Sequence, residues 1–255
     1  MTLSVIIITK NEAANIAACL DGVAFADEII VLDGASSDDT VHIAQAHGAR
    51  VVNAPEWSGF GPQKNRALAL ATQDWVLSID ADERVTPELA AQLRAATQQS
   101  KGHAYAIPRR TQFCGQWIDH CGWSPDYVLR LFKRGHARFS DDLVHERLIC
   151  STAQASRLTA PLLHYSYPTP IHYWRKLQQY AVAWASQAHA RGRKSSMIRA
   201  VTSAAWAFIK SYVLRLGFLD GGMGLAVCVM QAQAAFGKHF HLYCLNRQHA
   251  ASNSF

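Results

Sequence analysis

The stretch Trp75-Val-Leu-Ser-Ile-Asp-Ala-Asp-Glu-Arg84 decides the fold, because it joins a short apolar run to a cluster of carboxylates. Its first five residues predict a buried strand, and the acids follow where that strand ends. Side chains at positions i and i+2 of a strand point the same way, so Asp80 and Asp82 are expected to share a side and to repel each other. A divalent cation held by oxygen ligands would compensate their charge. The alternative is an acidic turn before a helix, because Thr86-Pro87-Glu88 is a favourable helix start.

Strands and helices alternate outward from this stretch, through the first hundred residues. Such alternation predicts an α/β fold with a mostly parallel sheet and crossover helices. The expected strands are Leu3–Ile8, Glu28–Leu32, Arg50–Asn53 and Asp74–Ile79, and the expected helices are Asn11–Leu20, 38–47, Gly61–Ala71 and Thr86–Thr97.

Polar residues follow all four predicted strands. Ligands of parallel α/β sheets bind beyond the carboxyl ends of the strands, so these segments are expected to line one rim. Taken singly, each has a plain structural explanation as a turn, a capping box or a solvated helix face. Together at one edge they indicate a binding site. They are Thr9-Lys-Asn-Glu12, Asp33-Gly-Ala-Ser-Ser-Asp-Asp-Thr40, Gly59-Phe-Gly-Pro-Gln-Lys-Asn-Arg66 and Asp80-Ala-Asp82.

The chain changes character after this alternating part. Short strands are expected near Val128–Phe132 and Arg147–Cys150 within an otherwise irregular region. The segment His164-Tyr-Ser-Tyr-Pro-Thr-Pro170 marks a boundary, because its two prolines disfavour a helix. We therefore expect one domain over residues 1–167 and a helical region over 168–255, with helices at about 171–190, 197–217 and 222–236.

Charge is divided unevenly between these two regions. The chain carries a net charge of +6, but residues 168–255 hold ten Lys and Arg side chains against the single acid Asp220, which is a net +9. Residues 1–167 hold 15 basic and 18 acidic side chains, a net −3. The two regions are therefore expected to do different jobs. The N-terminal segment has no basic stretch before its short apolar run, and it predicts a strand and not a signal peptide.

The six cysteines form no CxxC pair and no regular framework. Cys114, His120 and Cys121 make only a loose cluster, which is a weak zinc candidate. Reduced thiols are the favoured interpretation, and they are typical of the cytoplasm.

The basic region has an amphipathic helix. Ile198, Val201, Phe208 and Ile209 fall on one side of the helix expected over 197–217. The longest stretch without charge, Gly221–Gly237, has seventeen residues, fewer than the about 20 that a spanning helix needs. We expect a region that lies on an anionic membrane surface. A helical subdomain packed against the sheet is the alternative, and both can hold.

Two nucleotide-binding classes are excluded by motif. No GxGxxG follows the first strand, and no GxxxxGK[ST] occurs in the chain, so neither a dinucleotide-binding Rossmann protein nor a P-loop enzyme is indicated. A nucleotidyltransferase would need a Gly-rich triphosphate loop near the N-terminus. Thr9-Lys-Asn-Glu12 is not one.

The order of these motifs resembles the family-2 inverting glycosyltransferases with the GT-A fold. The resemblance covers the first hundred residues closely and continues more loosely through Gly122–Phe132 and Leu143-Val-His-Glu146. The whole arrangement, with its basic tail and Gly217-Phe-Leu-Asp-Gly221, is similar to the bacterial lipopolysaccharide inner-core β-glucosyltransferases. The resemblance implies a GT-A domain of Rossmann-like architecture followed by a helical, basic, membrane-proximal region.

The resemblance also implies roles for the polar rim. Asp82 would coordinate Mg²⁺ or Mn²⁺ bridging both phosphates of the donor, Asp80 would lie by the ribose and the metal, and His145 is a further candidate ligand or phosphate contact. The cations would neutralise the diphosphate. The residues expected to bind the nucleotide-sugar are Thr9, Asn11, Glu12, Asp33, Lys64, Arg66, Asp80 and Arg130.

An inverting transfer also needs a base that takes the proton of the acceptor hydroxyl. In the family this base is an acid shortly before a Leu-Arg-Leu-like segment, a position that Asp126 fits. The family often has an acidic pair there, whereas this chain has Pro125 in the first place. Glu146 is the alternative base.

The resemblance implies a UDP-sugar donor, with glucose as the expected sugar, and a heptose of the lipopolysaccharide core as acceptor. The protein would work peripherally at the cytoplasmic face of the inner membrane. A variant of this function has another donor, or a lipid phosphate or polysaccharide as acceptor. An alternative from another class is a basic nucleic-acid-binding protein, but the acidic rim argues against nucleic acid as a partner.

Overall fold

The computed structural model describes residues 1–99, 102–140, 147–150 and 155–252. The chain divides into two compact units. The first consists of Met1–Arg110 and Asp126–Tyr165, and the second of Thr111–Pro125 and Ser166–Phe255. The expected boundary after residue 167 lies near the later division, but residues 111–125 group with the C-terminal helices.

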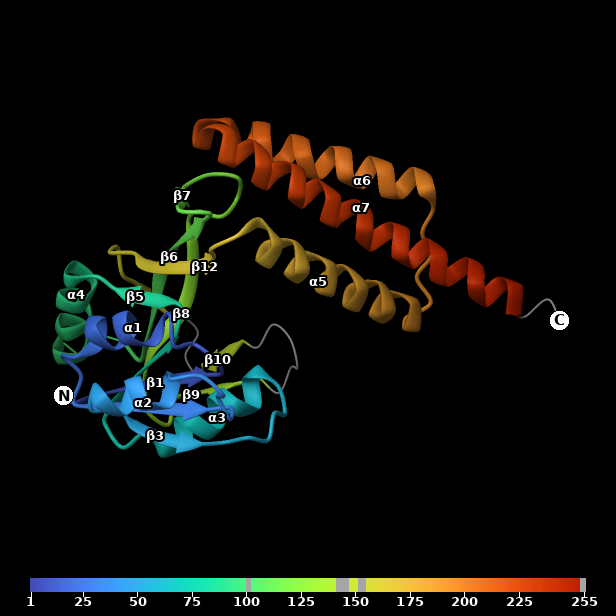
Figure 1. The fold of residues 1–255 in the computed structure, drawn as a ribbon. Coiled ribbons are helices and arrows are strands. Elements are labelled where there is room, and N and C mark those ends of the chain that lie inside the picture. Colours follow the sequence, from blue (N-terminus) through green and yellow to red (C-terminus); the bar gives the residue numbers. More distant parts are fainter. Residues whose placement is uncertain (100–101, 141–146, 151–154, 253–255) are drawn as a thin grey trace. The chain divides into compact units, whose positions relative to one another are not determined.

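The first unit contains most of a sheet whose strands run in the order β3-β2-β1-β4-β8-β6-β12-β5 (Figure 1). Strands β6 and β12 each continue across a division between the units. The elements are β1 (Leu3–Thr9), α1 (Ile16–Val23), β2 (Glu28–Asp33), α2 (Thr40–Ala46), β3 (Arg50–Asn53), α3 (Phe60–Leu70), β4 (Trp75–Asp80), β5 (Glu83–Val85), α4 (Pro87–Gln99), β6 (Ala104–Phe113), β8 (Asp126–Lys133), β9 (Ala137–Phe139), β10 (Leu148–Cys150), β11 (Ser156–Arg157) and β12 (Leu162–Tyr167).

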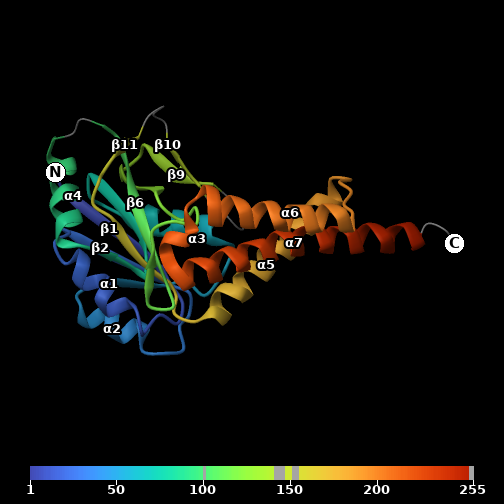
Figure 2. The same ribbon diagram turned by 90° about the horizontal axis from the view of Figure 1, so that it is seen from above.

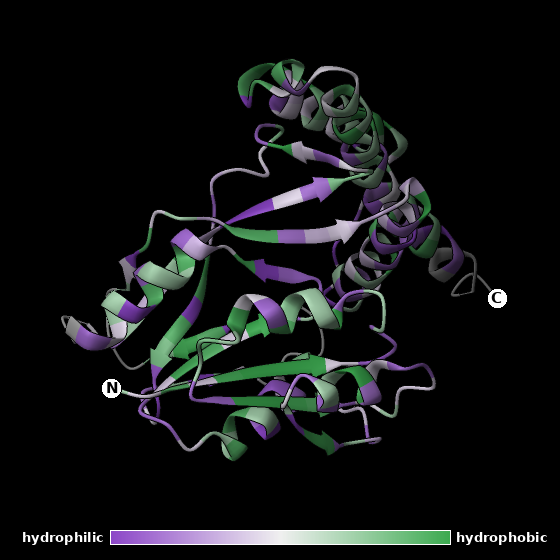
Figure 3. Ribbon diagram, turned by 60° about the vertical axis from the view of Figure 1, so that its left-hand side comes forward, coloured by the Kyte–Doolittle hydropathy of each residue, from purple (hydrophilic) through white to green (hydrophobic). Residues whose placement is uncertain are grey.

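Strands β1 to β4 form the parallel, Rossmann-like half of this sheet, as expected. β1, β2 and β4 are largely apolar and appear green in Figure 3, because both of their faces are covered, whereas β3 is partly exposed. Alternate residues supply the two faces: Val5 packs in the core shared with α1 and α4, and Ile6 in the core shared with α3. Helices packed on both faces hold these strands in place. The positions of the strand ends, which carry the polar rim, are thereby set.

The other strands make an antiparallel extension. β8 pairs antiparallel with β4 and β6, and β12 pairs antiparallel with β5. Only part of this was expected: Val128–Phe132 lies within β8, but β5, β6 and β12 were not predicted. The segment after Asp82 therefore is not simply a turn before a helix, because Glu83–Val85 forms an edge strand against Leu162–His164.

Two differences at strand ends bear on the site. The first helix begins at Ile16 and not at Asn11, because Asn11 has a φ of 56° and starts a turn. β4 ends at Asp80, so extended geometry does not continue to Asp82. The geometric argument for a shared side therefore does not extend to Asp82, and each carboxylate has partners of its own.

The second unit is a short hairpin with a group of helices. Helices α5 and α6 both pack along α7, as Figure 2 shows. The helix expected over 197–217 is interrupted near its end, and the last helix continues well beyond residue 236. The elements are β7 (Gln116–Ile118), α5 (Pro170–Ala190), α6 (Met197–Ile209), the π-helical turn η1 (Lys210–Leu214), the 3-10 turn η2 (Gly217–Asp220) and α7 (Gly221–Ser252).

Within the described residues, no single helix has the length and apolar composition to cross a bilayer. The segments Met197–Leu214 and Gly217–Gln248 meet that test only when they are taken as a pair, and they are bent by 74° relative to each other.

Asp220 ties the hairpin of the second unit to the start of α7. Its buried carboxylate accepts hydrogen bonds from the backbone N–H of His120 (2.8 Å) and from the Cys121 thiol (3.6 Å), and it lies 2.8 Å from His120 Nδ1. Two members of the loose cluster, His120 and Cys121, are thus held by a carboxylate. Among the residues that the structure describes, no group of three side chains is arranged to hold a metal ion.

Two buried thiols are expected to resist alkylation in the native protein. Burial raises the pKa of Cys19 and of Cys121, so neither thiol ionises or is accessible near neutral pH. Brief treatment with N-ethylmaleimide should label the half-buried Cys150 and Cys244 first. Mass spectrometry of the peptides would measure the order, with urea-unfolded protein as the control. Equal labelling of all thiols in the native state would contradict the burial of the first two.

Candidate active site

The centre of the rim is Asp80, whose carboxylate lies between two cations. Lys64, on α3, places its Nζ 3.0 Å from Asp80 Oδ1, and Arg130, on β8, places an Nη 2.7 Å from Oδ2. Both cations are buried. β8 runs antiparallel beside β4 with Leu131 opposite Leu77, and this register brings Arg130 to the end of β4. The positive charge that was expected to compensate Asp80 is therefore supplied by two side chains, Lys64 and Arg130.

Glu83 completes this cluster from β5. Its side chain is fully buried. One oxygen lies 2.6 Å from Arg130, and the other accepts a hydrogen bond of 2.9 Å from the backbone N–H of Asp80. Arg109, on β6, lies 3.8 Å from the first oxygen. Glu83 thus holds the end of β4 and a guanidinium in one arrangement.

The charges of this cluster are mutually stabilised. Burial by itself would raise the pKa of Asp80, but Arg130 and Lys64 hold that pKa well below its usual range. Burial would likewise lower the pKa of Arg130, and Asp80 and Glu83 raise it above its ordinary value. Asp80 and Arg130 therefore stay ionised at neutral pH, and their arrangement is held by side chains of the protein itself.

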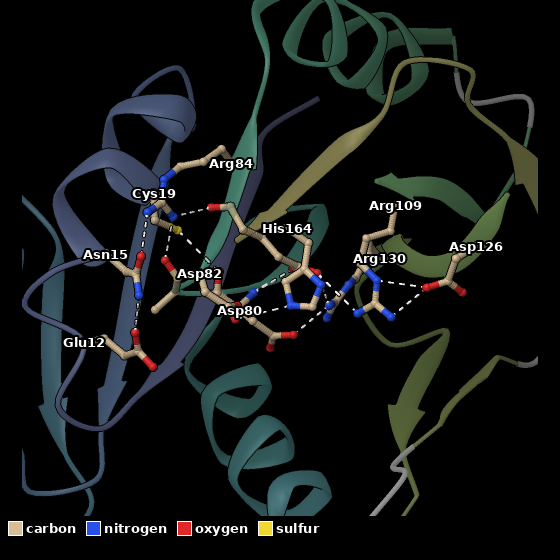
Figure 4. Close-up of polar contacts among 12 residues, drawn as sticks. Glu12, Asn15, Cys19, Asp80, Asp82, Arg84, Arg109, Asp126, Arg130 and His164 are labelled. Carbon is tan, nitrogen blue, oxygen red and sulfur yellow. Dashed lines mark hydrogen bonds and ion pairs between the residues drawn. The ribbon is translucent and has the colours of Figure 1, made fainter. Parts of the chain in front are cut away.

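Asp126 stands at the outer end of the same row (Figure 4). It is the register partner of Arg109 across β6 and β8, and Arg109 donates two hydrogen bonds, of 2.7 and 3.0 Å, to one of its oxygens. The second carboxylate oxygen has no such bond from Arg109. About 39% of the Asp126 side chain is exposed, so this candidate base can reach a substrate.

Asp82 faces a different partner. His164, on β12, lies opposite Glu83 in the strand register, and its Nε2 is 3.3 Å from Asp82 Oδ2 (Figure 4). The backbone N–H of Tyr165 donates to the carbonyl of Asp82 at 2.8 Å, which fixes the turn. A carboxylate is a suitable ligand for Mg²⁺ or Mn²⁺, and an imidazole beside it favours the softer Mn²⁺. Two protein ligands are too few for a complete shell, so these residues fit a cation whose other ligands come from a substrate. Asp80 is already held by its two cations.

A second group of polar contacts lies at the ends of β1 and β2. Asp33 is buried, accepts a hydrogen bond of 3.1 Å from the Thr9 hydroxyl, and accepts another of 2.8 Å from the backbone N–H of Ser36. Ser36 in turn accepts from the backbone N–H of Asn11 at 2.8 Å. The expected residues Thr9, Asn11 and Asp33 are thus brought together, and Ser36 joins them.

Glu12 belongs to a neighbouring chain of contacts just before the start of α1. It accepts a hydrogen bond of 2.8 Å from Asn15, and Asn15 accepts one of 3.1 Å from Arg84 (Figure 4). Burial raises the pKa of Glu12, with the bond from Asn15 acting in the opposite direction. Arg84 also donates to the carbonyl of Ala81 at 2.7 Å, and so links this chain to the turn that carries Asp82.

Lys64 and Arg66, which were expected to act as a pair, lie on different faces of α3. Lys64 is buried against Asp80, whereas Arg66 is exposed and donates to the carbonyl of Glu56 at 3.1 Å and to Gln63 at 3.0 Å. A separation of two residues places side chains on different faces of a helix. Two other candidates, His145 and Glu146, lie outside the described residues.

The site contains three further side chains, which were not assigned to it from the sequence. Glu83 was visible in the opening stretch and has a structural role there. Arg109 lies on β6, a strand that was not predicted, and His164 was noticed only as part of a boundary segment. Neither residue stands near a motif, so only strand pairing reveals their place.

Comparison with known proteins agrees with this architecture. Residues 4–152 match the model of the family described as Glycosyl transferase family 2. An uncharacterized glycosyltransferase of Rickettsia prowazekii is 32% identical over 246 residues, which cover 92% of this chain and 84% of that protein. LpsC of Rhizobium meliloti, a lipopolysaccharide core biosynthesis glycosyltransferase, is 26% identical over 260 residues, covering 94% of this chain and 93% of LpsC.

A solved structure shows the same fold. The crystal structure of S. aureus TarS 1–349 superposes with a TM-score of 0.50 at 15% identity, covering 97% of this chain and 92% of that one. The expected GT-A architecture is thereby confirmed at the level of the fold. With the family model matching residues 4–152, this chain belongs to glycosyltransferase family 2.

Proposed function

We propose that the protein transfers glucose from UDP-glucose, with inversion at the anomeric carbon, to a heptose of the lipopolysaccharide inner core. The observation that carries this proposal is the row of polar contacts at one rim of the sheet. It runs from Asp33 past Asp82 and the Asp80 cluster to Asp126. This row offers contacts for a nucleoside, a diphosphate and an acceptor hydroxyl in that order.

The nucleoside end rests on Asp33 and Asn11. A buried carboxylate held by Thr9 and Ser36 is oriented to accept hydrogen bonds from a base such as uracil. The diphosphate is proposed to meet Lys64 and Arg130, which already form a cationic pair around Asp80.

The acceptor end rests on Asp126. The acceptor oxygen forms a bond to the anomeric carbon while the bond from that carbon to the diphosphate oxygen breaks. The hydroxyl proton passes to the Asp126 carboxylate, and UDP leaves with the electron pair. Arg109, by its two hydrogen bonds to one carboxylate oxygen, holds Asp126 in position and leaves the other oxygen for the proton.

A divalent cation is part of the proposal. Asp82 and His164 are the described residues that would hold it, with the donor phosphates completing its coordination. Bound there, Mg²⁺ or Mn²⁺ would supply Lewis-acid stabilisation of the departing diphosphate.

The proposed acceptor is supported by a relative. LpsC, at 26% identity over nearly its whole length, is named for lipopolysaccharide core biosynthesis. A core acceptor is anchored in the inner membrane during its synthesis, so the enzyme is proposed to act at the cytoplasmic face of that membrane. The same site chemistry also suits a lipid phosphate or polysaccharide acceptor, or another sugar donor.

Asp82→Asn is expected to weaken metal-dependent UDP binding at least tenfold, since an amide is a poorer cation ligand than a carboxylate. Titration calorimetry with UDP, with and without Mn²⁺, would measure the change. Asp21→Asn is the matched control, because Asp21 is an exposed carboxylate on α1. Equal Mn²⁺-dependent affinity in wild type and Asp82→Asn would contradict the metal role. No UDP binding by the wild type at all would redirect the search to other nucleotide donors.

The transfer itself is tested with a panel of UDP-sugars and core-oligosaccharide acceptors. UDP release that requires both UDP-glucose and a heptose-containing acceptor is the expected result. Release that requires a different donor or acceptor would keep the glycosyltransferase and overturn this substrate pair.

A further inference from the structure

Helix α6 exposes most of its large apolar side chains, although Phe208 packs against the core that contains Val227 and Cys228. Ala200 is fully buried and Ser211, in the following turn, nearly so. Ile198 is 77% exposed, and Trp206 is 58% exposed. A helix of a water-soluble domain normally shows the reverse pattern. Helices that contact lipid pack against each other through small residues and turn large apolar side chains outward.

The exposed apolar surface continues beyond α6. Leu214, Leu216 and Leu219 are each exposed by 45% or more, and Leu225 and Val229 extend the surface one and two turns into α7. We call the exposed large apolar side chains of residues 197–229 the apolar bend. The turn at its centre is largely green in Figure 3.

The apolar bend is rigidly held. A Cβ atom on Gly224 would lie 2.1 Å from the carbonyl oxygen of Gly217, and a Cβ on Gly217 would lie 2.7 Å from Cys228 Sγ. The backbone segments of η2 and α7 therefore touch closely, which only glycine permits.

The exposed charged side chains within residues 197–229 are all positive. Arg199, Lys210 and Arg215 are exposed beside the apolar bend. The one acid between residues 168 and 255 is Asp220, and it is buried in its contacts with His120 and Cys121. A second copy of this chain would bring another strongly positive unit to the same surface. An anionic lipid surface is complementary to it both in charge and in polarity.

Dimensions favour a helix that lies along the membrane. The 13 residues of α6 extend about 20 Å, less than the about 30 Å of a bilayer core. Arg199 near its start and Lys210 just past its end stand on the same flank. Both charges reach headgroups at once only if the helix axis is parallel to the membrane plane.

We propose that the apolar bend inserts into one leaflet of an anionic phospholipid bilayer, with Arg199, Lys210 and Arg215 at the phosphate level. The proposal names the surface by which the enzyme meets the membrane, and in that sense rests on the proposed function. It deepens that function by assigning a lipid partner to particular side chains, and its test does not need sugar transfer.

Flotation with vesicles of phosphatidylcholine, with and without phosphatidylglycerol, tests the proposal on the full chain. The wild type should float with the anionic vesicles. Ile209→Ser combined with Leu214→Ser should lower the partition coefficient at least tenfold. Val182→Ser is the matched control, because Val182 is 47% exposed on α5, outside the apolar bend, and it should float like the wild type.

Charge and insertion are tested separately. Arg199→Gln and Lys210→Gln should each lower binding to anionic vesicles about fivefold and leave the weak binding to neutral vesicles unchanged. Quenching of Trp206 by brominated acyl chains should occur in the wild type and be lost in Trp206→Phe. Quenching that remains in Trp206→Phe would place another tryptophan in the bilayer and overturn the assignment.

Three outcomes would overturn the proposal: a wild type that does not float, an Ile209→Ser and Leu214→Ser variant that floats as well as wild type, or a wild-type dimer that this variant abolishes without vesicle binding. Transfer to a water-soluble acceptor distinguishes the two ideas. Lost flotation with intact transfer removes only the membrane surface, whereas intact flotation with no transfer removes only the proposed function.

Discussion

Asp126→Asn is expected to lower kcat by a factor of about 10² to 10⁴, with little change in the KM for the donor. Removal of the acceptor proton requires an ionised carboxylate, and an amide cannot take that proton. The amide oxygen can still accept from Arg109, so the β6–β8 pairing should survive. Initial rates of UDP release, together with UDP affinity by calorimetry, would measure the split between turnover and binding.

Glu146→Gln is the comparison for this result, because Glu146 is the other candidate base. A loss of turnover in Glu146→Gln that exceeds the loss in Asp126→Asn would assign the base to Glu146. Arg109→Gln should give an intermediate loss of kcat, because it removes the group that positions Asp126 and leaves the carboxylate in place. An Arg109→Lys variant should restore part of that loss. It should also shift the pH dependence of kcat less than Arg109→Gln does.

Arg130→Met is expected to lower the free energy of unfolding of the first unit by about 3 to 5 kcal/mol. Arg130 is buried between Asp80 and Glu83, and its removal leaves the buried Glu83 and the partly exposed Asp80 with one fewer cation. Arg130 also holds the pKa of Asp80 down against burial, so the pKa of Asp80 should rise in the variant. Urea unfolding followed by tryptophan fluorescence, to which the buried Trp75 of the first unit contributes, would measure the loss of stability.

Arg134→Met is the matched control for Arg130→Met. Arg134 follows β8, and its guanidinium donates a hydrogen bond of 2.9 Å to the carbonyl of Gln73 at an exposed position. Its replacement should change the free energy of unfolding by less than about 1 kcal/mol. Equal losses in the two variants would mean that the buried cluster contributes no more to stability than an exposed contact does.

The parallel half of the sheet could be predicted from the sequence because each of its strands is marked by a local pattern of residues. Strands β1, β2 and β4 are apolar runs that end in polar motifs, and the helices between them follow the chain without long-range pairing. The polar rim could be assigned for the same reason, since the carboxyl ends of parallel strands meet at one edge. Thr9, Asn11 and Asp33 were placed together on that argument and are found together.

The antiparallel half was only partly readable because its strands pair with distant partners. β5 has three residues and β12 has six, and their pairing joins positions about eighty residues apart. β5 lacks the length, and β12 the clear apolar–polar alternation, that marks a strand by itself. Helix α1 was predicted to start too early, because the positive φ at Asn11 depends on contacts with Ser36 and Ser37.

The sequence by itself determined the α/β class, the order of the motifs, the carboxylates at the end of β4 and the concentration of positive charge in the C-terminal region. These depend on residue type and on spacing along the chain. Only the tertiary structure decided that Lys64 and Arg130 balance Asp80, that His164 faces Asp82, and that Arg109 holds Asp126. Each of these contacts joins separate elements, and their positions are set by strand register and core packing, which no local pattern encodes.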